Sequence, residues 1–271
     1  MVRSLWSGAT GMMAQQVAVD TISNNIANVN TVGYKTSQNE FKSLLYQELQ
    51  TKTTSAKGET KPIDSQVGLG VRSSSITTIF KQGAFLESGN ESSVAIGGKG
   101  MFGVQRADGS VAYTRNGDFH FSVTTKGFAL TDSDGNGVLD TKGKPIEITG
   151  EYTVNRLSIA QDGSISYPDK DNNPASIGVS IGMWQFHNPA GLTKLDSSLY
   201  QESAASGPPM NEATSNNLEK SIMVQGYLEG SNVQLADEMV NLIIAQRAYE
   251  ANSRVITTSD TMMQQANQLK Q

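Results

Sequence analysis

Two stretches with a seven-residue period decide how this chain folds: LWSGATGMMAQQVAVDTISNNIANV at residues 5–29 and LADEMVNLIIAQRAYEANSRVITTSDTMMQQANQL at residues 235–269. An apolar residue every seven positions is typical of helices that pack on other helices, because it places one apolar stripe along each helix. A lone helix is marginally stable in water, so we expect these helices to order only against each other or against other subunits. The stripes comprise Leu5, Met12, Val19, Ile26, Leu235, Leu242, Tyr249, Ile256 and Met263.

The two predicted helices have recognisable ends. Asparagine and glycine at residues 28–33 favour the turn conformations that stop a helix, so the first helix is expected to end there. The second is expected to run from Ser231 to Leu269, with Ser231 or Asn232 as its N-cap. Asn25 and Asn28 lie in the last turns of the first helix, where their amides either cap it or bridge to neighbouring helices. We include these two amides with the apolar stripes as predicted subunit-interface residues.

The composition argues against several kinds of partner. The 271 residues carry a net charge of −5 and 37% hydrophobic residues, enough for one or two domains. No basic stripe is present to neutralise phosphates, which argues against nucleic acid. No apolar run could span a bilayer and residues 1–8 lack a signal-peptide pattern, so we expect a soluble, uncleaved chain without membrane insertion. Disulfides and thiolate chemistry are excluded because the chain has no cysteine.

The region between the helices divides into a polar part and a strand-rich part. Residues 34–71 contain too few apolar side chains for a core, so they are predicted to be a linker or an arm that orders on a neighbour. Between residues 76 and 200 apolar and polar residues alternate, which is typical of β-strands. Two-residue hairpin turns are predicted at Asp108-Gly109 and Asn116-Gly117, and further turns at Asp134-Gly135 and Asp162-Gly163.

These observations predict an α+β fold with three parts. The terminal helices form a coiled-coil-like domain from residues 1–32 and 228–271. An extended connecting arm and a return segment occupy residues 33–72 and 201–227, and residues 73–200 form an all-β domain. A self-standing dimeric coiled coil is disfavoured because polar residues, Gln246, Ser253 and Asp260, lie near the edge of the C-terminal stripe.

Two segments invite a ligand-binding interpretation. Gly97-Gly98-Lys99-Gly100 is glycine-rich, but no helix follows and no Lys-Ser/Thr pair ends it, so a phosphate loop is disfavoured. Residues 132–140 space their oxygen ligands like the first half of a calcium loop. Gly143, however, stands where a bidentate glutamate is needed, and a solvated turn is the better interpretation.

No residue pattern requires an enzyme. His120 is expected to point outward from a strand, and His187 lies in a turn beside Asn188-Pro189. Neither histidine has a nearby carboxylate arranged for a metal or a proton relay. Glu229 and Asp237 could form an acid/base pair, but carboxylates on predicted helix surfaces are usually solvated. We therefore predict no catalytic, cofactor-binding or metal-binding residues.

Several motifs resemble the bacterial flagellar rod and hook proteins. NNIANVNTVGYK at residues 24–35 resembles that family's N-terminal motif, and QGYLEGSNV at 225–233 with QRAYEANS at 246–253 resembles its C-terminal motif. LLYQ at residues 44–47 and VGLGVR at 67–72 are similar to the distal-rod members, whose arm is long in this place. The resemblance covers well over half of the chain, and the motifs occur in the expected order.

The resemblance implies a non-enzymatic structural subunit that polymerises helically into the hollow distal rod, the drive shaft that transmits torque from motor to hook. Implied partners are further copies of the chain, other rod subunits and the hook protein at the ends, the surrounding ring proteins and the flagellar export apparatus. The implied location is the basal-body rod in the periplasmic space, reached without a cleaved signal peptide. Alternatives are a proximal-rod or hook subunit and, from another class, a calcium-stabilised secreted adhesin or hydrolase module.

Overall fold

The computed structural model describes residues 2–50, 65–125, 127–149, 152–153, 156–169, 173–215 and 218–269. The chain forms two compact units. Unit 1 contains residues 1–27, 37–77 and 234–271, and unit 2 contains residues 28–36 and 78–233. The α+β class is confirmed, because two long helices lie in unit 1 and a strand-rich core lies in unit 2. The predicted domain limits remain predictions.

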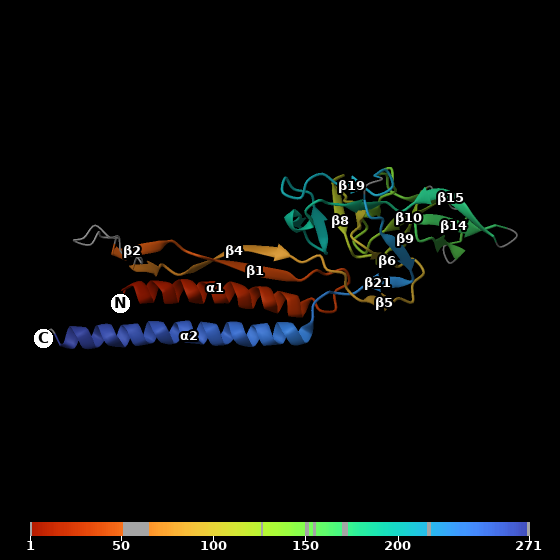
Figure 1. Ribbon diagram of the computed structural model, residues 1–271. Helices are drawn as coiled ribbons and strands as arrows, with labels where there is room; N and C mark the ends of the chain where they lie inside the picture. Colours follow the sequence, from red (N-terminus) through yellow and green to blue (C-terminus); the bar gives the residue numbers. More distant parts are fainter. Residues whose placement is uncertain are drawn as a thin grey trace. The chain divides into compact units, whose positions relative to one another are not determined.

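The helices of unit 1 are α1 (Val2–Ala27) and α2 (Leu235–Gln268), which lie side by side (Figure 1). The predicted start of the second helix at Ser231 is wrong. Its N-cap is Gln234, which makes no side-chain cap hydrogen bond. Asp237 and Glu238 place negative charge in the first turn, where it interacts favourably with the positive end of the helix dipole.

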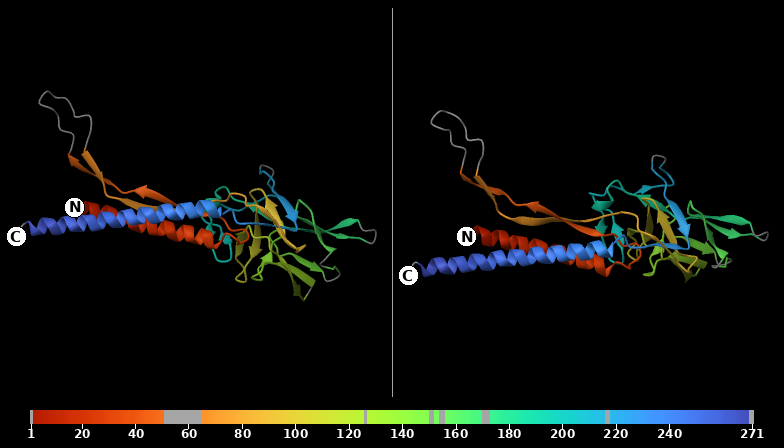
Figure 2. Two further views of the ribbon diagram at one scale, coloured as in Figure 1. Left: turned by 90° about the horizontal axis from the view of Figure 1, so that it is seen from below. Right: turned by 60° about the horizontal axis from the view of Figure 1, so that its bottom comes forward.

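The polar segment after α1 forms paired strands. β1 (Ser37–Ser43) pairs with β4 (Val71–Thr78), and β2 (Tyr46–Gln50) pairs with β3 (Ser65–Gly68). β1 lies along α1 (Figures 1 and 2). The flanks of the predicted linker are therefore a two-stranded ribbon, which needs little apolar content because α1 supports it. The centre of the predicted arm, residues 51–62, lies outside the described residues.

Unit 2 is built from antiparallel strands. Its largest sheet has the order β12-β10-β11-β7-β8-β18-β17, with β9 paired to β10, β16 to β7, and β19 to β16. Smaller sheets are β13-β14-β15, β20-β6 and β21-β5, and Pro189–Gly191 form a 3-10 turn. The strands are β5 (Phe85–Glu87), β6 (Val94–Gly97), β7 (Met101–Gln105), β8 (Val111–Thr114), β9 (His120–Thr124), β10 (Gly127–Thr131), β11 (Gly137–Val138), β12 (Glu147–Thr149), β13 (Ser158–Ile159), β14 (Ser164–Pro168), β15 (Pro174–Ser180), β16 (Met183–Gln185), β17 (Thr193–Lys194), β18 (Leu199–Gln201), β19 (Met210–Asn211), β20 (Ile222–Gln225) and β21 (Tyr227–Glu229).

Three of the four predicted turns join paired strands. Asp108-Gly109 joins β7 to β8, Asp134-Gly135 joins β10 to β11, and Asp162-Gly163 joins β13 to β14. The hairpin predicted at Asn116-Gly117 is wrong, because β8 pairs with β7 and β18 while β9 pairs with β10. The carbonyl of Gly117 instead accepts a hydrogen bond from the amide of Val94 at 3.0 Å, which ties this segment to β6.

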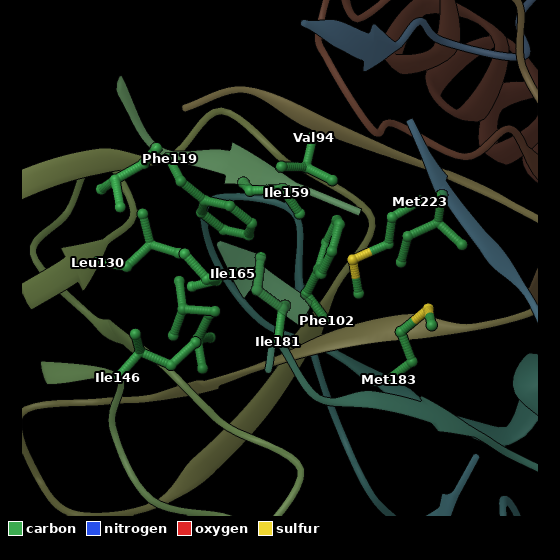
Figure 3. Close-up of a cluster of buried hydrophobic side chains, with 14 of the residues drawn as sticks. Val94, Phe102, Phe119, Leu130, Ile146, Ile159, Ile165, Ile181, Met183 and Met223 are labelled. Atoms are coloured by element: carbon green, nitrogen blue, oxygen red, sulfur yellow. The ribbon is translucent and has the colours of Figure 1, made fainter. Parts of the chain in front are cut away.

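The core of unit 2 consists of two hydrophobic clusters. In the larger one Phe102 and Phe119 pack edge to face with ring centroids 4.9 Å apart, and both are fully buried (Figure 3). In the smaller one Tyr113 packs edge to face on Phe186 at 4.8 Å. Because apolar burial is the main driving force of folding, these clusters allow unit 2 to hold its own fold.

Unit 2 should lose stability at alkaline pH. Burial, reinforced by the negative charge of Glu202, raises the pKa of Tyr113 from 10.0 to about 12. The unfolded chain therefore releases this proton before the folded chain does, so Tyr113 contributes stability that is complete below pH 10 and is lost between pH 10 and 12. Urea unfolding at pH 9, 10, 11 and 12 should show a falling midpoint. Tyr113→Phe should flatten that fall, and an unchanged slope in this variant would contradict the assignment.

Candidate assembly site

The seam between α1 and α2 is fixed by polar contacts at regular intervals. The hydroxyls of Ser4 and Ser259 lie 3.0 Å apart, and the amide of Asn25 donates to Glu238 Oε2 at 3.2 Å. Between these pairs, a Cβ on Gly11 would lie 2.7 Å from Asn252 Nδ2. The three positions on α1 are separated by seven and then fourteen residues. Their partners on α2 have the same separations, but in the opposite chain direction. The helices are therefore antiparallel in one heptad register, as the seven-residue period requires.

The face of α1 that is buried in unit 1 carries small or polar side chains. A Cβ on Gly8 would lie 3.0 Å from Ile256 Cγ1, so small residues set the closest approach of the two helices. The sequence indicates the heptad period correctly. The larger apolar residues that reveal this period, however, each lie one position after a residue of the face that contacts α2. The buried residues are Gly8, Thr10, Gly11, Ala14, Ala18, Thr21 and Asn25.

The predicted apolar stripes occupy the flanks of the seam. Leu5, Met12, Val19 and Ile26 are all half-buried on α1, as are Leu242, Ile256 and Met263 on α2. Leu235 and Tyr249 are more open, with 43% and 42% of their surface exposed. Val19 and Tyr249 line a groove of about 400 Å³ together with Gln16, Gln246 and Glu250. The stripe residues are thus partly covered within one chain, and their role between subunits stays a prediction.

The two predicted asparagines have different surroundings. Asn25 is 1% exposed, and its amide donates to the Ser37 carbonyl at 2.8 Å while its oxygen accepts from the Ser37 amide at 2.9 Å. With its bond to Glu238, Asn25 joins α1, the ribbon and α2 within the chain. Asn28 lies in the turn after α1, where its side-chain oxygen accepts from Thr31 at 3.1 Å.

The first three turns of α2 carry large apolar side chains that remain about half exposed in the described chain. The exposed fractions are 43% for Leu235, 53% for Met239, 56% for Val240, 56% for Ile243 and 60% for Ile244. Residues spaced by four lie on one side of a helix, so these side chains form a continuous surface, here called the outer face of α2. The seven-residue period includes only Leu235 of this face, although the four-residue spacing of Leu235, Met239 and Ile243 is visible in the sequence.

Unit 2 contains a buried cluster of charged side chains, here called the junction cluster: Lys35, Arg115 and Glu229. Lys35 Nζ donates to Glu229 Oε1 at 2.5 Å, and Arg115 Nη1 donates to Glu229 Oε2 at 3.1 Å. Lys35 and Glu229 are fully buried. Burial lowers the pKa of Lys35, and the negative charge of Glu229 opposes this shift. Burial likewise lowers the pKa of Arg115, and the negative charge of Glu229 opposes this shift as well.

The position of Glu229 corrects the sequence interpretation. It is the last residue of β21 and belongs to no helix surface, whereas Asp237 is exposed on α2. Its partners Lys35 and Arg115 are 194 and 114 residues away in the sequence. Because no local pattern connects residues at such separations, sequence reasoning could not find this cluster.

The segments considered for ligand chemistry have structural roles. Gly98 has a φ of +133°, and a Cβ there would lie 2.7 Å from Ser221 Oγ, while its carbonyl accepts from Arg115 Nη2 at 2.5 Å. Asp132 Oδ1 accepts from the amides of Asp134 and Asn136 at 2.8 and 3.0 Å, which closes a turn. His120 and His187 are exposed, and His120 Nε2 lies 3.9 Å from Asp118 Oδ1, a nearby carboxylate that the sequence interpretation did not expect. No metal-binding group of three His, Cys, Asp or Glu side chains occurs in the described ranges.

Among the described residues, neither α1 nor α2 is both long and apolar enough to cross a bilayer.

Three family models match the chain. The flagella basal body rod protein model matches residues 5–35, the flagellar hook protein FlgE/F/G D1 domain model matches 95–167, and the flagellar basal body rod FlgEFG protein C-terminal model matches 224–269. Similar proteins match over the whole length. The flagellar basal-body rod protein FlgG of Borreliella burgdorferi is 40% identical, with 100% of this chain and 99% of the relative covered. FlgG of Bacillus subtilis is 38% identical with both chains fully covered.

A second protein of Bacillus subtilis, the flagellar hook-basal body complex protein FlhP, is also similar over both full lengths, at 28% identity. FlgG of Buchnera aphidicola subsp. Schizaphis graminum is 41% identical over 99% of this chain. The matched segments include all of α2, α1 from Leu5 onward and all three residues of the junction cluster.

Proposed function

Because this chain belongs to the FlgG family of flagellar basal-body rod proteins and is a structural subunit of the distal rod, we propose that its copies assemble into a hollow helical tube that carries torque to the hook. Members of the family assemble with other rod and hook components, and the rod of the basal body is where the protein resides. The family also makes it a non-enzymatic protein, which removes the alternative of a secreted hydrolase.

The observation that carries this proposal is the outer face of α2. Five large apolar side chains in three helical turns, each at least 43% exposed, form a patch of the kind that marks protein contacts. α1 is also poor in charge, since only Arg3 and Asp20 are charged among its 26 residues. A contact between different surfaces of successive copies generates a helix when the rotation does not close. We propose such a contact between the outer face of α2 and the helices of a neighbouring copy.

The remaining partners follow from the same proposal. Copies at the two ends of the tube contact other rod subunits and the hook protein. Unit 2 contacts the surrounding ring proteins, and the chain reaches the periplasmic rod through the flagellar export apparatus without a cleaved signal peptide. The arm at residues 51–62 is proposed to lock each copy to its neighbours.

Replacement of Ile243 by aspartate tests the outer face directly. Ile243 is 56% exposed, so the purified chain should keep its helicity and its stability within about 0.5 kcal/mol. In the assembled rod the new carboxylate is buried without a partner, which costs several kcal/mol per contact. We therefore expect cells that make the variant but build no hook, seen by electron microscopy of isolated basal bodies.

Ala251→Asp is the matched control, because it adds the same charge to an exposed position of α2 about two turns beyond the patch. It should interfere less with assembly. Complete hooks in the Ile243→Asp strain would show that the outer face of α2 is not an assembly contact.

A further inference from the structure

Four passages of the chain connect the two units, after residues 27, 36, 77 and 233. In unit 2, the residues next to these four crossings form three short segments, residues 28–36, 78–83 and 229–233. Any force carried along the backbone between the units must enter unit 2 through these segments. How the three segments are held together therefore decides how such a force is distributed.

Two side chains of residues 229–233 form hydrogen bonds to both of the other segments. Glu229 Oε1 accepts from Lys35 Nζ at 2.5 Å and from the amide of Gly83 at 2.9 Å. Asn232 Oδ1 accepts from the Thr36 amide at 2.8 Å, and its Nδ2 donates to the Ile79 carbonyl at 2.9 Å. Each of these two residues therefore contacts residues 28–36 and residues 78–83 at the same time.

Backbone contacts also join the three segments to one another. The amide of Gly33 donates to the Glu229 carbonyl at 2.7 Å, and the amide of Ile79 donates to the Thr36 carbonyl at 2.9 Å. A Cβ on Gly83 would lie 2.1 Å from the carbonyl oxygen of Gly230, so only glycine allows these two segments to approach so closely. The three segments are joined pairwise.

The charges of the junction cluster need an explanation other than stability. Well-packed apolar residues of similar size are often as stabilising as a buried ion pair, and the best-attested use of such a pair is to fix one register. Arg115 extends the pair into the body of unit 2, because its guanidinium also donates to the carbonyl of Gly98. Glu229 thus connects residues 28–36 and 78–83 to Arg115, and through Arg115 to the β core.

We propose that Glu229 and Asn232 form a load-sharing clamp, which keeps the three crossing segments together so that force arriving along one passage is spread over all of them. The inference rests on the proposed function, since a torque-carrying subunit is loaded along its chain. Without the clamp, a force on residues 28–36 would peel that segment away while the other segments remained unloaded. With the clamp, contacts to all three segments must break together.

Force spectroscopy on the purified full chain tests the clamp separately from rod assembly. The chain has no native cysteine, so Asn30→Cys and Ser133→Cys, both at exposed positions, provide unique handles for pulling residues 28–36 away from the β core. In Glu229→Gln, Lys35 and Arg115 stay buried without their counterion. The detachment rate of the segment at constant force should rise about a hundredfold. The later unfolding of the β core should keep its force.

Glu219→Gln is the matched control, because it makes the same change in the Lys99–Glu219 pair, whose side chains are exposed. It should leave the detachment rate unchanged. Asn232→Ala provides a second variant that adds no buried charge, and it should also detach faster than the parent. A detachment rate equal to the parent's in both Glu229→Gln and Asn232→Ala would overturn the clamp. Faster detachment in both variants, together with complete hooks in the Ile243→Asp strain, would instead count against the proposed assembly contact alone and leave the clamp in place.

Discussion

Gly117→Ala is expected to unfold unit 2 under conditions in which the parent chain is fully folded. A Cβ at this position would lie 1.6 Å from the carbonyl oxygen of Val94, which is fully buried. The obstacle is backbone, so no side chain can rotate away, and the Val94 amide to Gly117 carbonyl bond must break. We expect a loss of more than about 4 kcal/mol, at the upper limit of single-residue effects. Urea unfolding followed by near-ultraviolet circular dichroism measures it.

Gly89→Ala supplies the control for this substitution. Apart from its two chain neighbours, no described residue has an atom within 4 Å of a Cβ at Gly89, and its backbone does not adopt a positive φ. Its unfolding free energy should stay within about 0.5 kcal/mol of the parent's. Similar midpoints for the Gly117 and Gly89 variants would refute the close-packing explanation.

Leu242→Asp is expected to open the helix pair of unit 1 and to leave the cell without a hook. Leu242 is half-buried one turn beyond Glu238, which is buried against Asn25, so the substitution places a second carboxylate four residues from the first. Loss of a fully buried leucine costs about 2 to 5 kcal/mol, so the half-buried Leu242 contributes a smaller part of this, and like charges at this spacing also repel. Limited proteolysis should cut α1 and α2 early, whereas unit 2 should keep its sheet spectrum.

The neighbouring variant Ile243→Asp separates two causes of a missing hook. Leu242→Asp should damage the monomer itself, whereas Ile243→Asp should leave the helix pair closed and affect only contacts between copies. If both purified variants resist proteolysis equally and the Leu242→Asp strain builds normal hooks, Leu242 has no role in closing the helix pair or in assembly.

The sequence period predicted the two helices and their heptad spacing, because 3.6-residue geometry imposes that period on any packed pair. It did not predict which face of α1 is buried. Large apolar residues such as Met12 and Val19 reveal the period, but the close approach to α2 occurs at Gly8 and Gly11, where the lack of a side chain allows it. Hydrophobicity indicates which helices pack, and side-chain size decides where they meet.

The junction cluster and the ribbon were beyond sequence reasoning for a different reason. Glu229 is a charged residue whose burial depends on partners more than 100 residues away, and its charge suggests solvent exposure. The ribbon strands lack strong apolar alternation because their support comes from α1 rather than from a sheet. The family motifs pointed to both regions without giving the physical reason that the contacts supply.

The contacts that close both units join opposite ends of the chain, and this sets the order in which the protein can fold. Lys35 and Glu229 are 194 residues apart, Asn25 and Glu238 are 213 apart, and Ser4 and Ser259 are 255 apart. Contacts of such sequence separation form late and slowly, because a long loop must close before they add any stabilisation. A chain still lacking its last forty residues contains neither the partner of α1 nor Asn232. The native state is therefore available only to complete chains.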